Sequence, residues 1–162
     1  MNGNPGIILM MARESGVMGT LSFEQVGTRD DFEMVWPLLV HAMGAADDAH
    51  KVRWQESYLK HPAYQLWVLK DGGRPRGVIG VRLADPAEIT HIAVAPDDRG
   101  RGYGTRLIQS IREWKSGLTR WYAETDDEAV GFYRRLGFTV EMLPPQYPGI
   151  NRYRCDWVDG SI

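Results

Sequence analysis

The sequence has little cysteine and no strong excess of either charge. Cys155 is the single cysteine among 162 residues, so no internal disulfide can form, and this usage is typical of a reducing, cytoplasmic compartment. The formal net charge is -2 at pH 7, with 19 Lys and Arg against 21 Asp and Glu. Composition therefore does not indicate nucleic acid or an acidic membrane surface as a partner.

Long apolar runs and metal-ligand clusters are also lacking. No apolar stretch approaches the roughly 20 residues that cross a bilayer. The short run "IILMMA" follows no basic residue and is too short for a usual signal-peptide core. Because no His or Cys residues have metal-ligand spacing, we expect no metal. We expect residues 1–19 to be a flexible leader and residues 20–162 to form a single domain.

Hydropathy patterns predict a mixed α/β fold with the element order β-α-α-β-β-β-α-β-α-β-β. Strands are expected in seven stretches: 21–27, 64–70, 77–84, 88–94, 119–125, 138–142 and 151–158. Helices are expected after a Thr28–Asp31 capping pair and over three further stretches: 47–60, 105–114 and 127–136. This order predicts an antiparallel first half followed by a βαβ crossover.

Glycines are concentrated in "DDRGRGYGTRL" (97–107), where a predicted strand is followed by a helix. The start of a helix presents unpaired N–H groups and a positive dipole end, and Gly100, Gly102 and Gly104 would let a ligand approach them closely. This arrangement favours a phosphate or pyrophosphate group. The P-loop lysine is missing, and Thr105 replaces the third glycine of the dinucleotide fingerprint. A plain surface turn remains the alternative.

The spacing Arg99-x-x-Gly102-x-Gly104 after "HIAVAP" resembles the pyrophosphate loop of the GNAT superfamily of acyl-CoA N-acyltransferases. A second stretch, "DDEAVGFYRRLGF" (126–138), is similar to that family's N-x-x-A-x-x-F-Y-x-x-x-G-F signature. Asp126 stands where Asn is frequent, and aspartate caps a helix as well as asparagine does. The resemblance covers about residues 20–158 and implies a GNAT-like fold around a central mixed, mostly antiparallel sheet.

The resemblance also implies an activity and a binding site. It implies transfer of an acetyl group from acetyl-CoA to a primary amine of a small molecule or protein, by direct attack in a ternary complex. The alternatives are a non-catalytic acyl-CoA-binding domain and another kind of nucleotide-binding module. A homodimer is compatible with the resemblance. Coenzyme A would be held by these positions: Ile92, Ala93, Val94, Arg99, Gly100, Arg101, Gly102, Tyr103, Gly104, Thr105, Asp126, Ala129 and Phe132.

Two residues are expected to carry the proton transfers. The resemblance implies that Tyr133 is the general acid that protonates the departing thiolate. The alternative is that Tyr133 is an aromatic residue of the core. Glu88 in "EITHIAV" resembles the glutamate base of the histone-acetylating branch, with a solvated strand end or pairing to Arg82 as alternatives. His91 is the second choice as base, because strict alternation places it on the opposite face from Glu88 unless a bulge intervenes.

The acceptor pocket is expected to form between the loop joining the first two helices and the loop 142–153. Asp47, Asp48 and Glu88 could favour a cationic amine, and three aromatic residues could form walls: Trp54, Tyr147 and Tyr153. Helix caps, core packing and loop packing are the alternative roles. Arg134 and Arg135 could approach the 3′-phosphate of the cofactor or form a solvated face. Cys155 is interpreted as a small core residue.

Overall fold

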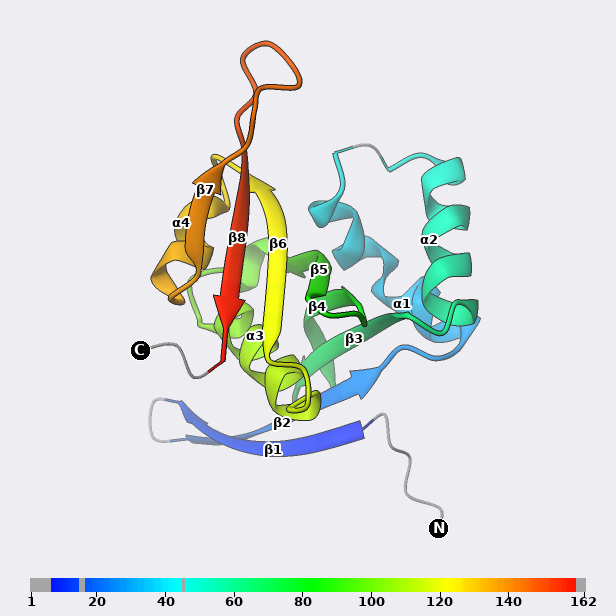
Figure 1. Ribbon diagram of the computed structural model, residues 1–162. Coiled ribbons are helices and arrows are strands. Elements are labelled where there is room, and N and C mark those ends of the chain that lie inside the picture. Colours follow the sequence, from blue (N-terminus) through cyan, green and yellow to red (C-terminus); the bar gives the residue numbers. More distant parts are fainter. Residues whose placement is uncertain (1–6, 15–16, 45, 160–162) are drawn as a thin grey trace.

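The computed structural model describes residues 7–14, 17–44 and 46–159 (Figure 1). Its strands are β1 (Ile7–Glu14), β2 (Val17–Gln25), β3 (Tyr64–Asp71), β4 (Arg74–Arg82), β5 (Ala87–Val94), β6 (Arg120–Asp126), β7 (Thr139–Met142) and β8 (Arg152–Val158). Its helices are α1 (Arg29–Leu39), α2 (Asp48–Lys60), α3 (Tyr103–Trp114) and α4 (Val130–Arg135), with short 3-10 turns η1 (Val40–Ala42) and η2 (Pro96–Asp98).

The strands form one sheet in the order β1-β2-β3-β4-β5-β6-β8-β7. Neighbouring strands are antiparallel except for β5 and β6, which are parallel and joined through α3. From β2 onward the element order is the predicted one, and the predicted mixed, mostly antiparallel α/β fold is confirmed.

The N-terminal segment differs from the expected flexible leader. Residues 7–14 form β1, which pairs antiparallel with β2 from Ile7↔Glu24 to Glu14↔Val17. A short apolar run such as "IILMMARE" suits an edge strand, because pairing with β2 satisfies one side of its backbone. Residues 1–6, 15 and 16 of the expected leader lie outside the described residues.

Helices cover both faces of the sheet, because side chains alternate along each strand. In β3, Leu66 and Val68 pack with α1 and α2, whereas Trp67 and Leu69 pack with α3. Figure 1 shows α1 and α2 together on one side of the strands, away from α4. Each face therefore has its own hydrophobic core.

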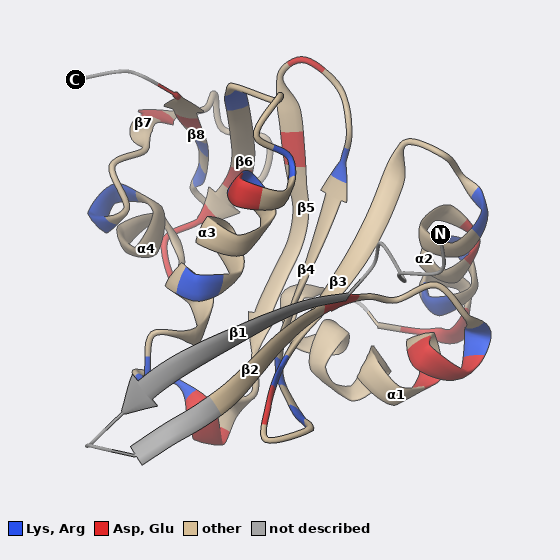
Figure 2. Cartoon of the chain, turned by 90° about the horizontal axis from the view of Figure 1, so that it is seen from below, with Lys and Arg blue, Asp and Glu red and all other residues tan. Residues whose placement is uncertain are grey.

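Local signals fix the ends of the helices. The Thr28 side chain accepts a hydrogen bond from the Asp31 backbone N–H, and Asp47 does the same for His50, so both predicted caps are confirmed. Gly137 has φ +93° directly after α4, a conformation that favours glycine. Figure 2 shows Lys, Arg, Asp and Glu mainly on helices and turns, with most of β3 and β4 uncharged. No helix in the described part of the chain combines the length and apolarity that a membrane span needs.

Candidate active site

The site begins where β5 and β6 separate. These parallel strands pair only at Ala87↔Trp121 and Glu88↔Tyr122. Beyond this point both strands line a pocket of about 770 Å³, together with the glycine loop and α4. Splayed parallel strands leave backbone groups without a sheet partner on the facing edges, so the pocket can accept an extended ligand between them.

The glycine loop forms an open cradle at the start of α3. Gly102 is the N-cap of the helix with φ +83°, and Gly100 has φ +79°. A Cβ at either position would meet no heavy atom within 4 Å, so the space above the loop is free for a ligand. The N–H groups at the start of an α-helix of 12 residues point towards such a space, which suits a pyrophosphate.

A partly buried ion pair anchors the turn that precedes this loop. Arg76 Nη1 donates a hydrogen bond to Asp98 Oδ1 over 2.8 Å, and Asp98 is buried at the end of η2. The Tyr103 hydroxyl donates to Asp71 Oδ2 over 2.8 Å at the first residue of α3. The loop is therefore held at both ends by side chains of the β3–β4 hairpin.

The two sequence motifs meet at Gly104. A Cβ at this position would lie 2.9 Å from Cε1 of Phe132, so only glycine lets the start of α3 approach α4 this closely. Asp126 Oδ1 accepts hydrogen bonds from the backbone N–H groups of Glu128 and Ala129, as expected for its capping role. The contact brings the predicted pyrophosphate loop and the second motif to one pocket.

Almost all residues predicted to hold coenzyme A line this pocket. They are Ile92, Ala93, Val94, Arg99, Gly100, Gly102, Tyr103, Gly104, Thr105, Asp126, Ala129 and Phe132. Arg101 is outside the lining, and its guanidinium lies 3.8 Å from the Asp98 carboxylate. The pocket thus has the glycine cradle and helix start that a pyrophosphate needs, while the binding roles themselves stay predictions.

Tyr133 is buried between α4 and the sheet and also lines the pocket. Burial, and to a lesser extent Cys155, raises the pKa of its phenol above the ordinary value. The phenol therefore stays protonated at neutral pH and retains a proton to donate. Packing between Phe132 and Phe138, with ring centroids 5.2 Å from each, shows that the core role and the predicted acid role are compatible.

Glu88 lies below the pocket, where β5 and β6 still pair. Its Oε1 accepts a hydrogen bond from Arg82 Nε over 3.1 Å, and Arg82 Nη2 donates to the Tyr122 hydroxyl over 3.0 Å. Glu88 is not among the residues that line the pocket in the described part of the chain. Pairing with Arg82, one of the sequence-based alternatives, is what the structure shows, and a base role for Glu88 stays a prediction.

A β-bulge at Thr90 corrects the expected faces of β5. Gly80 pairs with His91 and Val81 with Ile89, so Thr90 is an extra residue on its strand. Thr90 and His91 consequently both reach Tyr58 of α2, whereas Ile92 turns to the core under α3. Strict alternation, which made His91 the second choice as base, therefore does not hold in β5, and the bulge that the sequence left open is present.

None of the residues expected to form the acceptor pocket is among the described residues that line the pocket. Asp47 caps α2 and bonds the His50 side chain, and Asp48 is exposed in the same turn. Three aromatic residues are placed elsewhere: Trp54 on Tyr58, Tyr147 exposed in the β7–β8 loop, and Tyr153 donating to Asp127. Of the two arginines after Tyr133, Arg135 lines the pocket.

Several pocket residues were not predicted from the sequence, among them His41 of η1, Glu124 of β6 and Arg152 of β8. Glu124 carries a weak signal, because it alternates with buried Ala123 and Thr125 near the end of a strand. His41 and Arg152 carry none, since His41 follows α1 in η1 and Arg152 reaches the pocket through the pairing of β8 with β6 at Asp126. Within residues 7–14, 17–44 and 46–159, no group of three or more His, Cys, Asp or Glu side chains could hold a metal ion.

Comparisons with known proteins agree with this geometry. A family model described as an acetyltransferase (GNAT) domain matches residues 62–140. An uncharacterized N-acetyltransferase of Methanocaldococcus jannaschii is 31% identical over 130 residues, covering 68% of this chain and 58% of that protein. A peptidyl-lysine N-acetyltransferase of Salmonella typhimurium is 34% identical over 97 residues, covering 56% of this chain and 65% of that protein.

A solved structure shares the fold. An aminoglycoside 6′-N-acetyltransferase complexed with coenzyme A superimposes with a TM-score of 0.72 at 16% identity, covering 84% of this chain and 96% of that one. The chain spans less than two thirds of the length of the two curated relatives. The matched domain, the relatives, the fold and the two motifs together show that this chain belongs to the GNAT superfamily of acyl-CoA N-acyltransferases.

Proposed function

We propose that this chain transfers an acetyl group from acetyl-CoA to a primary amine of a small molecule or protein. The observation that carries the proposal is the single pocket in which the open glycine cradle and the buried Tyr133 phenol both lie. A pyrophosphate site alone could bind many kinds of nucleotide, and a buried tyrosine alone could simply be part of the hydrophobic core. Their union in one pocket supports acyl-CoA chemistry.

The residues of this chain would divide the work as follows. The loop N–H groups around Gly102 and Thr105 bind the pyrophosphate, and the free edge of β5 from Ile92 to Val94 binds the pantetheine arm. Direct attack of the amine forms the new C–N bond and breaks the C–S bond. An amine that arrives as an ammonium loses one proton to water before it attacks and a second one as the C–N bond forms, and the departing sulfur must gain one.

Tyr133 is the proposed source of the proton that the sulfur gains: it lines the pocket, and burial raises its pKa, so the phenol is protonated at pH 7. For the proton that the nitrogen loses as the C–N bond forms, Glu88 is the proposed base. Its carboxylate is paired with Arg82 and lies outside the pocket lining, so it would act through water. Cys155 is buried in the core on β8, outside the described pocket lining, which favours direct transfer over a covalent acyl-cysteine.

The acceptor is proposed to bind near His91 and Glu124, which line the pocket from the neighbouring strands β5 and β6, and His41 and Arg152 line it as well. Glu124 is exposed there and supplies a carboxylate for an ammonium group. Because one relative is a peptidyl-lysine N-acetyltransferase, a lysine peptide belongs among the acceptors to be tested.

Thermal melting with saturating acetyl-CoA tests the binding half of the proposal, with NAD and ATP as controls. A ligand at about 100 times its dissociation constant stabilises the folded state by about 2.7 kcal/mol. We expect a clear rise in melting temperature with acetyl-CoA alone. No shift with acetyl-CoA, or an equal shift with ATP, would contradict the proposed site.

A further inference from the structure

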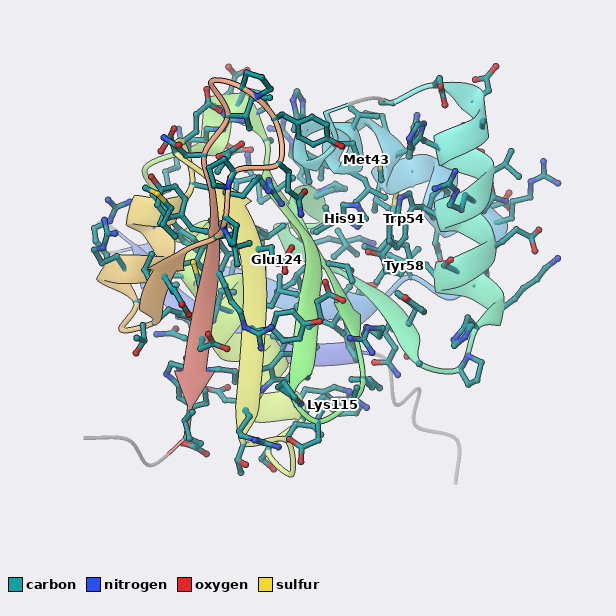
Figure 3. All side chains as sticks on the ribbon, turned by 45° about the horizontal axis from the view of Figure 1, so that its top comes forward. Met43, Trp54, Tyr58, His91, Lys115 and Glu124 are labelled. Atoms are coloured by element: carbon teal, nitrogen blue, oxygen red, sulfur yellow. The ribbon has the colours of Figure 1, made fainter. Side chains whose placement is uncertain are left out.

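Beside the pocket lies a buried polar cluster that the proposed chemistry leaves unused. The Tyr58 hydroxyl of α2 lies 2.6 Å from Thr90 Oγ1 and 2.5 Å from His91 Nδ1. Tyr58 is 3% exposed and His91 8% exposed, and His91 lines the pocket. Figure 3 shows Trp54 and Tyr58 extending from α2 towards His91 on β5, with Glu124 on the neighbouring strand β6.

Three elements are shaped to build this cluster. The bulge in β5 turns both Thr90 and His91 to the α2 face. Gly80 of β4 pairs with His91, and a Cβ at this position would collide with the Tyr58 hydroxyl. Trp54 meets the His91 ring edge-on, with centroids 4.4 Å apart at 88°, which fixes the plane of the imidazole. The bulge, the missing side chain at Gly80 and the packing of Trp54 therefore together leave room for the Tyr58 hydroxyl at this position.

The direction of the hydrogen bonds follows from the three groups. The Tyr58 hydroxyl has one proton for two partners, and burial raises its pKa, so it stays protonated. Of the two partners, the imidazole nitrogen is the more basic acceptor, and a phenol is a stronger donor than the threonine hydroxyl. These differences favour a chain in which Thr90 O–H donates to Tyr58 and Tyr58 O–H donates to His91 Nδ1. Each bond in such a chain strengthens the next.

We propose that Tyr58 and Thr90 hold His91 as the Nε2–H tautomer, so that His91 presents a hydrogen-bond donor to the acyl oxygen in the pocket. A neutral imidazole whose Nδ1 accepts a hydrogen bond must carry its proton on Nε2. His91 Nε2 has no hydrogen-bond partner among the residues that the structure describes, so it is free to donate into the pocket. The assignment of the acyl oxygen rests on the proposed function, whereas the tautomer does not.

The same hydrogen bonds, together with burial, make His91 unsuitable as the base. Burial lowers the pKa of His91 to about 4, so the ring is neutral at pH 7. Its accepting nitrogen is occupied by Tyr58, and the nitrogen left for the pocket is the one that carries the proton. A fixed neutral donor can stabilise negative charge that develops on an acyl oxygen. Tyr58 is then a positioning residue, because it acts only through His91.

The tautomer is tested in the free protein by long-range ¹⁵N–¹H NMR correlations of His91 at pH 7. We expect a protonated Nε2 and an unprotonated, hydrogen-bonded Nδ1. Thr90→Val should leave this tautomer unchanged, because Tyr58 still donates, whereas Tyr58→Phe should produce a mixture of tautomers. A wild-type spectrum with the proton on Nδ1 would overturn the proposal, and so would an unchanged tautomer in folded Tyr58→Phe. If Tyr58→Phe does not fold, the wild-type spectrum decides.

Two substitutions of His91 test the donor role by thiol release from acetyl-CoA with an accepted amine. The Gln side chain in His91→Gln keeps an N–H donor but cannot act as a base. The Leu side chain in His91→Leu can neither donate a hydrogen bond nor act as a base. We expect kcat of His91→Gln within about tenfold of wild type, and a loss on the order of 100-fold for His91→Leu. Equal large losses in both variants, or no loss in His91→Leu, would contradict a donor role. Wild-type protein that releases no thiol would refute the proposed function while leaving the NMR result valid.

Discussion

Tyr133 is the residue on which the proposed acyl transfer depends most directly. Its phenol is buried, protonated and part of the pocket lining. Tyr133→Phe removes only the hydroxyl, so packing against Phe132 and Phe138 is kept. We expect kcat to fall about 100-fold, the scale of a lost general acid. The melting shift with acetyl-CoA should stay as in wild type, and normal turnover in Tyr133→Phe would contradict the acid role.

His91 is predicted to make stability depend on pH. Its pKa is about 4 when folded and about 6.5 in an unfolded chain, so the unfolded state binds more protons in between. The folded state therefore loses stability as pH falls from about 6.5 towards 4. This loss amounts to about 2 kcal/mol between pH 7 and pH 4.5. The Tyr58 phenol, which is in hydrogen-bond contact with the ring, stays neutral over this range because burial raises its pKa.

Urea unfolding of wild type and His91→Gln at pH 7, 5.5 and 4.5 measures this dependence. Gln cannot titrate, so the variant should lack the part of the acid destabilisation that comes from position 91. The comparison uses the change with pH within each protein, so any constant cost of the substitution cancels. If the free energy of unfolding changed with pH in the same way in both proteins, burial would not lower the pKa of His91.

Much of the candidate site was predictable because short-range patterns encode it. The Arg99-x-x-Gly102-x-Gly104 spacing and the Asp126 cap depend on neighbours within a few residues, and the structure places them as the sequence indicates. The cluster of Tyr58, Thr90 and His91 was not predictable, because it needs a bulge whose position depends on contacts across three elements. No local periodicity carries that information.

At the scale of elements, the turn between β5 and α3 should respond to a side chain at its N-cap. Gly102→Ala places a Cβ in the free space above the loop, in a left-handed conformation that costs about 1 kcal/mol. We expect it to reduce the melting shift with acetyl-CoA in addition to this loss of stability. Gly73→Ala is a matched control, since Gly73 in the β3–β4 turn has φ +81° against +83° for Gly102, also with open space around it.

Both variants should therefore lose similar stability without ligand, measured by urea unfolding, and only Gly102→Ala should lose acetyl-CoA binding. If the two variants responded to acetyl-CoA alike, the cradle would not be the binding surface.

The splay of β5 and β6 is the other element-scale feature of the site. Its opening at Glu88↔Tyr122 explains why Glu88 lies below the pocket, although the sequence motif alone suggests a residue within it.

At the scale of the whole molecule, β1 lies at one edge of the sheet and the pocket lies between β5 and β6. A flexible leader was expected over residues 1–19, whereas residues 7–14 form β1. Removal of residues 1–16 should leave residues 20–162 folded as a domain and keep the melting shift with acetyl-CoA. The melting temperature without ligand should fall, because the edge of β2 loses its partner strand. Loss of the acetyl-CoA shift in a folded truncated protein would show that the domain extends to β1.

The central claim, acetyl transfer to an amine, is tested most directly by thiol release from acetyl-CoA with a panel of amines. The panel holds a polyamine, an aminoglycoside and a lysine peptide, and mass spectrometry identifies any acetylated amine. The proposed function predicts thiol release that requires one of these amines, with one acetyl group added to it, and a strong loss in Tyr133→Phe. Acetyl-CoA binding with no amine-dependent release across a broad panel would contradict the claim and favour a domain that binds acyl-CoA without turning it over.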